Sequence, residues 1–222
     1  MKKTYIYIGI GIVLLGLVVW WRVAGAAIVV VDSYSESHFA GYGYDSNSIQ
    51  NQIITQTFTV GNNITLDHAV FYIERFQNPT GNITASLYSQ TGTAGSGAHA
   101  NTLLATSDSV NITTISTSYN LVSFNFSGAN RYSLLASTGH YLIAINFSGG
   151  DISNSLITGT DNSFTSAHGN LAFTNDNGST WNYNGLNGSQ ENMIFYVYGD
   201  NGGGTPVIVS GSGQKMLMSM TY

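Results

Sequence analysis

The chain has 222 residues, no cysteine and two prolines, and charged residues make up only 8% of it. The absence of cysteine excludes disulfides, thiolate metal sites and cysteine nucleophiles, and the length allows one sizeable β domain or two small ones. Beyond residue 22 there are three basic and eleven acidic residues, a net charge of −8, which argues against nucleic-acid binding because that requires clustered lysine and arginine.

The first predicted element is a hydrophobic N-terminal segment, residues 1–26. Lys2 and Lys3 precede an uncharged stretch over residues 4–21, which is just long enough to span a bilayer as a helix. The lysines would then stay in the cytoplasm and the rest of the chain would lie outside. The alternative is a cleaved signal peptide, because Ala24-Gly25-Ala26 fits the small-x-small cleavage pattern. Both readings export the remaining chain, so we expect a secreted protein or one anchored on the extracellular face of a membrane.

Beyond residue 32 the apolar residues recur with a period of two, which indicates strands that bury one face. The predicted buried faces are Ile54/Phe58/Val60, Ile83/Ala85/Leu87, Val122/Phe124/Phe126 and Tyr141/Ile143/Ile145/Phe147. The threonines at 55, 57 and 59 form the opposite face of the first strand, and we expect that face to be exposed to water. Residues 68–76 and 192–199 are apolar on both faces, which is typical of central strands or strands covered by a loop.

Turns rich in Gly and Asn separate these runs, and we expect nine to eleven strands between Ile28 and Tyr198. This spacing predicts an all-β fold, a jelly-roll-like antiparallel β-sandwich over residues 27–199. Residues 200–222 form a Gly-rich linker followed by a short apolar tail, in which PVIVS (206–210) has β-forming character.

The order of these motifs resembles the choice-of-anchor domains, a loosely defined group of β-sandwiches on bacterial and phage surfaces. The resemblance covers about residues 50–199 and rests on four segments, 56–59 (QTFT), 66–71, 79–88 and 141–151. It implies an extracellular, anchored module with an adhesive or structural role and no agreed catalytic activity. The usual anchor of such proteins is C-terminal, whereas the candidate anchor here is N-terminal.

The sequence contains no G-x-S-x-G, H-E-x-x-H or P-loop motif, and its five histidines lie in separate segments without metal-ligand spacing. We therefore expect no enzymatic activity. A glycan hydrolase would need two facing carboxylates, for which Glu36 with Asp45 and Asp161 with Asp176 are the candidate pairs.

Calcium is the one candidate cofactor, and it would have a structural role. Asp151, Asp161 and Asp176 lie in turns rich in Asn, Gly and Ser, and oxygen ligands on loops suit Ca²⁺. The alternative is that these aspartates cap their own turns, because Asp and Asn side chains often accept hydrogen bonds from the nearby backbone.

The segment NGSTWNYNGLNGSQ (177–190) contains the candidate ligand-binding residues. Trp181 and Tyr183 are two apart, so on a strand they would share a face and form a platform for a sugar ring. Asn182, Asn184 and Gln190 would supply hydrogen bonds to the sugar. The alternative is that Trp181 covers the end of the core and binds nothing.

These features favour a non-enzymatic adhesive or carbohydrate-binding module whose partners are surface glycans or polymers, with membrane attachment through residues 4–21 if that segment is not cleaved. The alternative is a structural subunit of a surface layer, filament or virion. In that case residues 26–34 or 206–210 would self-assemble by completing a neighbour's sheet. A glycan hydrolase is the third hypothesis.

Overall fold

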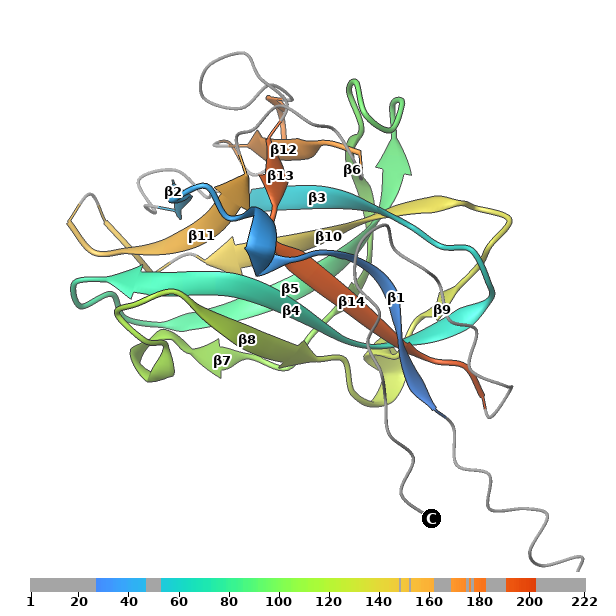
Figure 1. Cartoon of the computed structure of the whole chain (residues 1–222), viewed down its shortest axis with the longest axis horizontal. Helices are drawn as coiled ribbons and strands as arrows, with labels where there is room; N and C mark the ends of the chain where they lie inside the picture. Colours follow the sequence, from blue (N-terminus) through green and yellow to red (C-terminus); the bar gives the residue numbers. More distant parts are fainter. Residues whose placement is uncertain are drawn as a thin grey trace, which may run out of the picture.

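The computed structural model describes residues 27–46, 53–147, 149–151, 153–161, 169–174, 176, 178–182 and 191–202. Fourteen strands within these residues form two antiparallel sheets that pack face to face (Figure 1). The strands are β1 (Ile28–Tyr34), β2 (Tyr42–Ser46), β3 (Ile53–Thr59), β4 (Ile64–Phe76), β5 (Asn82–Thr91), β6 (His99–Thr106), β7 (Val110–Asn111), β8 (Asn120–Asn125), β9 (Ser133–Leu134), β10 (His140–Phe147), β11 (Ser155–Asp161), β12 (Leu171–Thr174), β13 (Asn192–Met193) and β14 (Phe195–Asp200). Three short 3-10 helices join them: η1 (Glu36–His38), η2 (Ile112–Thr114) and η3 (Gly128–Asn130).

The first sheet has the order β1-β14-β4-β11-β13, and β2, β8 and β9 pair with its inner strands. The second has the order β12-β3-β10-β5-β6, and β7 pairs with β5. The neighbours in both sheets differ from the sequence order, so most pairings join distant parts of the chain. The predicted antiparallel β-sandwich is confirmed.

The buried faces predicted from the period-two pattern meet between the two sheets. Ile54, Phe58, Phe124, Ile143 and Ile145 are at most 1% exposed and belong to one continuous apolar core. Residues 68–76 belong to the inner strand β4 and residues 195–199 to the inner strand β14, as predicted, whereas Asn192 and Met193 form β13 at the edge of the sheet. β4 pairs with β14, β8, β9 and β11, and β14 pairs with β1 and β4.

The expectation that the threonine face of β3 is exposed to water is wrong for two of its three residues. Thr55 and Thr57 are buried, and their hydroxyls bond to the backbone of β12 and of the residue that precedes it. The Thr55 hydroxyl donates to the Ala172 carbonyl oxygen at 3.0 Å, and the Thr57 hydroxyl donates to the Asn170 carbonyl oxygen at 3.4 Å. A hydroxyl can be buried at low cost when it has such a partner, so the alternation was not a reliable sign of exposure here.

The hydrophobic segment 1–26 and the tail segment 206–210 lie outside the described residues. Within the part of the chain that the structure describes, no helix has the length and apolar character needed to cross a membrane. β1 pairs along its length with β14 of the same chain, so this segment of the predicted donor strand 26–34 is already used in its own sheet.

The start of β1 and the end of β14 lie together at one end of the sandwich (Figure 1). The β5–β6 loop, β12 and β13 lie well away from that place, at the top of the view. An N-terminal anchor would therefore be attached to the domain at the end that lies far from the loops around β12.

Candidate ligand-binding surface

Trp181 lies on a turn that follows β12 and returns to pair with it. The Phe173 amide donates to the Asn182 carbonyl oxygen at 2.9 Å, and the Asn182 amide donates to the Phe173 carbonyl oxygen at 2.8 Å. This reciprocal pair closes a short loop between Phe173 and Asn182. Trp181 directly precedes Asn182, so this β-bridge restrains its backbone.

Asp176 organises the interior of this turn. Its carboxylate accepts a hydrogen bond from the Thr180 amide at 2.8 Å, one from the Thr180 hydroxyl at 2.6 Å and one from the Thr174 hydroxyl at 2.7 Å. These donors stabilise the ionised form, with the Thr180 hydroxyl as the largest contribution, and they lower the pKa of Asp176 to about 2. The carboxylate is therefore charged and fully engaged in the turn at neutral pH.

The indole of Trp181 is half-buried and lies beside the imidazole of His99 at the start of β6. The two ring centroids are 6.1 Å apart and the rings are inclined at 36°. Because the rings are not stacked face to face, His99 flanks the indole without covering it as a parallel ring would. Trp181 is not among the buried core residues in the described part of the chain.

The loop that carries His99 is also held in place by hydrogen bonds. The Asn170 side chain joins this loop to the entrance of β12, because it accepts from the Gly95 amide at 3.1 Å and donates to the Ala98 carbonyl oxygen at 3.0 Å. The His99 Nδ1 lies 3.0 Å from the Gly97 carbonyl oxygen. Both loops that meet at Trp181 are thus held by hydrogen bonds within the chain.

The structure locates part of the predicted platform. Asn182 is exposed next to Trp181, and its backbone forms the bridge to β12. Tyr183, Asn184 and Gln190 lie outside the described residues, so their proposed roles stay predictions. His99 is a neighbour that sequence reasoning missed, because it is 82 positions away and no local motif connects it to Trp181.

The three candidate calcium ligands lie in three separate hydrogen-bond networks. Asp151 accepts from the Ser153 amide at 2.7 Å and from the Asn154 side chain, and these bonds lower its pKa. Asp161 is buried at the end of β11 and accepts from the Tyr34 hydroxyl. No group of three or more His, Asp or Glu side chains suited to a metal ion occurs within the described ranges. The geometry around Asp151 and Asp176 is that of turn capping.

Sequence reasoning also missed a row of aromatic side chains on the outer face of the first sheet. Tyr198 stacks on His68 of β4 with ring centroids 4.2 Å apart and on Tyr196 at 6.3 Å. The Tyr196 hydroxyl donates to Glu36 of η1. Burial, as the larger cause, and the Glu36 carboxylate both raise the pKa of Tyr196. Because the faces of these rings contact one another, the row offers little free ring surface for stacking on a sugar.

Arg131 joins two carboxylates on the surface of the first sheet. Arg131 contacts Asp67 at 3.2 Å and Asp200 at 2.9 Å. Glu36, one of the candidate catalytic acids, is engaged by Tyr196.

The fold and this surface define the class of protein as an antiparallel β-sandwich with a tryptophan-bearing loop end. No known family model, curated protein or solved structure gives a significant match to the chain.

Proposed function

We propose that this protein is a non-enzymatic extracellular β-sandwich that uses its Trp181 end to bind neutral glycans or similar surface polymers. The observation that carries the proposal is a half-buried tryptophan on a turn that its own hydrogen bonds hold in place. Rigid loops lose little conformational freedom on binding, which favours affinity. Aromatic rings with polar neighbours are typical of small-molecule sites.

The polar groups around Trp181 suit a neutral ligand. Thr180 and Asn182 are exposed on either side of it. The Asn182 side-chain amide can donate and accept hydrogen bonds, and the Thr180 hydroxyl, which donates to Asp176, can still accept one. Asp176 is the one charged group among residues 176–182, and its exposed carboxylate accepts three hydrogen bonds from Thr174 and Thr180. An apolar ring with neutral hydrogen-bonding neighbours matches a sugar, which has an apolar face and hydroxyl edges.

The arrangement of the two ends supports a surface location. If residues 4–21 form a membrane helix, the chain enters the sandwich at the start of β1, far from β12 (Figure 1). The binding end would then be directed away from the membrane. We also propose that the N-terminal segment forms a helix, that the strands are connected as in a jelly roll, and that the domain belongs to the choice-of-anchor group.

Binding of the full-length chain in detergent to immobilised neutral and acidic polysaccharides tests the proposal. Trp181→Ala should weaken binding to a neutral polymer about tenfold or more, and Trp181→Phe should weaken it less. Phe76→Ala is the matched control, because Phe76 is an aromatic residue with 46% exposure at the end of β4. Unchanged binding by Trp181→Ala would contradict the proposal. We expect a calcium chelator to have no effect, because local donors already engage Asp176.

A structural subunit is the second candidate, and the observation that favours it is the exposed edge of the first sheet at β1. An apolar edge strand can pair with a strand from another chain. The oligomeric state of the full-length protein separates the two candidates, since an assembly subunit should form concentration-dependent oligomers and a solitary adhesive module should not.

A further inference from the structure

The edge of the first sheet is apolar and uncovered along the first half of β1. Within the described residues, β14 is the strand partner of β1, and the opposite edge of β1 ends the sheet. Ile28 and Val30 on this strand are 42% and 37% exposed. Natural proteins usually protect such an edge with charges, prolines or a covering segment, because it invites pairing with another strand.

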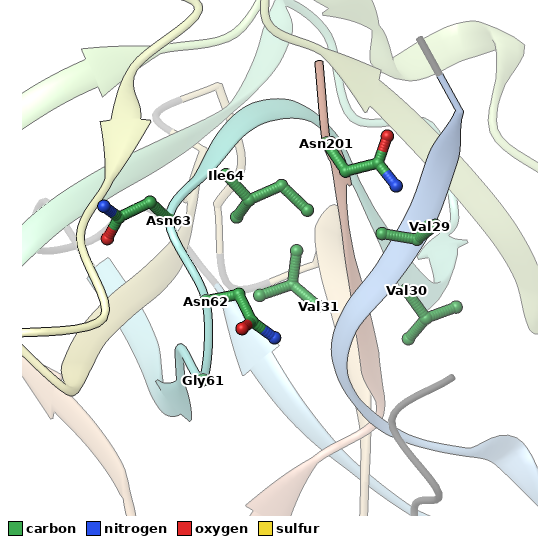
Figure 2. Close-up of a pocket in the computed structure, with 8 residues that line it drawn as sticks. All are labelled: Val29, Val30, Val31, Gly61, Asn62, Asn63, Ile64 and Asn201. Carbon is green, nitrogen blue, oxygen red and sulfur yellow. The ribbon is translucent and has the colours of Figure 1, made fainter. Parts of the chain in front are cut away.

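The inner side of the same stretch borders a small hollow between β1 and the start of β4. Val29, Val31 and Ile64 supply its apolar lining, and Asn62 and Asn201 lie at its margin (Figure 2). Figure 2 shows the side chains of Val31 and Ile64 near one another among the residues that line this hollow. The free edge of β1 is therefore apolar on both faces of the sheet.

In the second half of β1, the side chain of Asp32 binds backbone amides. Asp32 accepts from the Ser33 amide at 2.8 Å and from the Thr59 amide at the end of β3 at 2.7 Å. The pairing of β1 with β14 also shifts register between Val30 and Asp32, as in a β-bulge. The uncovered stretch is therefore short, residues 28–31, and a segment of about four or five residues would cover it.

The C-terminal segment of the chain begins directly beside this stretch. The Asn201 amide donates to the Ala27 carbonyl oxygen at 3.3 Å, and the Ala27 amide donates to the Asn201 side chain at 3.3 Å. A strand beyond β1 would lie two strand spacings from β14, about 10 Å. Residues 201–205 can reach about 17 Å when extended, so the next segment can start at that position.

We infer that residues 206–210 of this chain, PVIVS, add to the free edge of β1 as a strand parallel to it. Val207, Ile208 and Val209 alternate between the two faces of the sheet, so they cover both the hollow and the exposed side chains of Ile28 and Val30. Pro206 takes the first position of the strand, where a missing amide donor is tolerated. This inference stands independently of the proposed glycan binding.

The same chain is a better source of this strand than a second copy. A short linker keeps the segment at high local concentration, so pairing within the chain needs no encounter between molecules.

Cross-linking of introduced cysteines tests the inference, since the chain has no cysteine of its own. Val30→Cys is combined in the full-length chain with Val207→Cys, Ile208→Cys or Val209→Cys in turn, and each protein is treated with a short bis-maleimide. We expect at least one pair to give a bridged monomer in high yield, measured by intact mass and gel mobility. Leu103→Cys with the same tail cysteines is the control. Leu103 is 52% exposed on β6 in the other sheet, so a cysteine there should not be bridged to the tail. Bridged dimers would assign the edge to a second copy, and absence of any bridge would remove the tail from this edge; either result overturns the inference.

Hydrogen exchange supplies a second readout that does not depend on cysteine geometry. We expect the amides of residues 28–31 to exchange more slowly in the full-length chain than in the Ile208→Asp variant. Leu217→Asp, farther along the tail, should leave their exchange unchanged. Equal exchange in all three proteins would also overturn the inference.

Discussion

Asp176 and Thr180 are joined twice, because both the backbone amide and the hydroxyl of Thr180 donate to the carboxylate of Asp176. These two hydrogen bonds fix the conformation of the turn on which Trp181 lies. The position of the Trp181 ring thus depends on one ionised side chain five residues earlier.

The first prediction concerns Asp176→Asn, which should loosen the Trp181 turn and weaken polymer binding while leaving the sandwich folded. The amide can accept through only one oxygen, so it cannot replace all three hydrogen bonds. Trp181 fluorescence and binding to the neutral polymer measure the effect. Asp151→Asn is the control, since it alters a comparable exposed turn away from Trp181, and an equal effect of both variants would contradict a specific role of Asp176.

The second prediction is that acid releases the same turn. The pKa of Asp176 is about 2 in the folded protein, below the ordinary value of about 3.9 for the unfolded chain. The contribution of this carboxylate to stability is therefore fully present above about pH 4 and is lost as the pH falls through about 2. Exchange of the Thr180 amide, followed against pH, should accelerate in that window. A Thr180 amide whose protection is constant down to pH 1.5 would contradict the prediction.

The third prediction compares two tyrosine hydroxyls that each donate to a carboxylate. Tyr34→Phe removes a donor from Asp161, which is 3% exposed, and we expect a loss of about 1.5–3 kcal/mol in the free energy of unfolding. Tyr196→Phe removes a donor from the exposed Glu36, and the loss should be under about 1 kcal/mol. Urea denaturation measures both. Equal losses would mean that burial does not decide the strength of these bonds.

The fourth prediction concerns Gly149, where the turn after β10 approaches the turn before β5. A Cβ at this position would lie 1.8 Å from the Thr80 carbonyl oxygen, so Gly149→Ala must displace the backbone. We expect a loss of about 1–3 kcal/mol in the free energy of unfolding. Gly61→Ala is the control, because a Cβ there meets nothing within 4 Å, and it should be near neutral. A neutral Gly149→Ala would show that the two turns can separate freely.

The fifth prediction is that alkali destabilises the tyrosine row. Burial and Glu36 raise the pKa values of Tyr196 and Tyr198 above the ordinary value of about 10. The folded state therefore holds these protons longer than the unfolded chain, and stability should fall as the pH rises above about 10. The absorbance of the phenolate, followed through unfolding at each pH, measures this fall in stability. The fall should be smaller in Tyr196→Phe, and an identical profile in both proteins would contradict the assignment.

Any fragment of this protein made for binding assays should keep residues 28–32. A fragment that starts at residue 33 would remove Ile28 to Asp32, which pair with the end of β14. It would expose β14 and lose the bond from Thr59 to Asp32. Fragments should therefore begin at residue 27 or earlier.

Local information in the sequence was sufficient for the fold class and for most of the core. Alternation with a period of two is set by the strand backbone itself, so Phe58, Phe124 and Ile143 could be assigned to the buried face without knowledge of their neighbours. The low charge, the missing cysteines and the choice of Trp181 as a candidate also required no structure.

Only the tertiary structure decided which strands are neighbours, and several features of the surface follow from that. Thr55 and Thr57 are buried because residues 170–172, more than a hundred positions later, lie beside them. His99 reaches Trp181, and Tyr34 reaches Asp161, through pairings that join distant strands. A strand pattern specifies which face of a strand is apolar, but the partner on each edge depends on long-range packing, which no local pattern encodes.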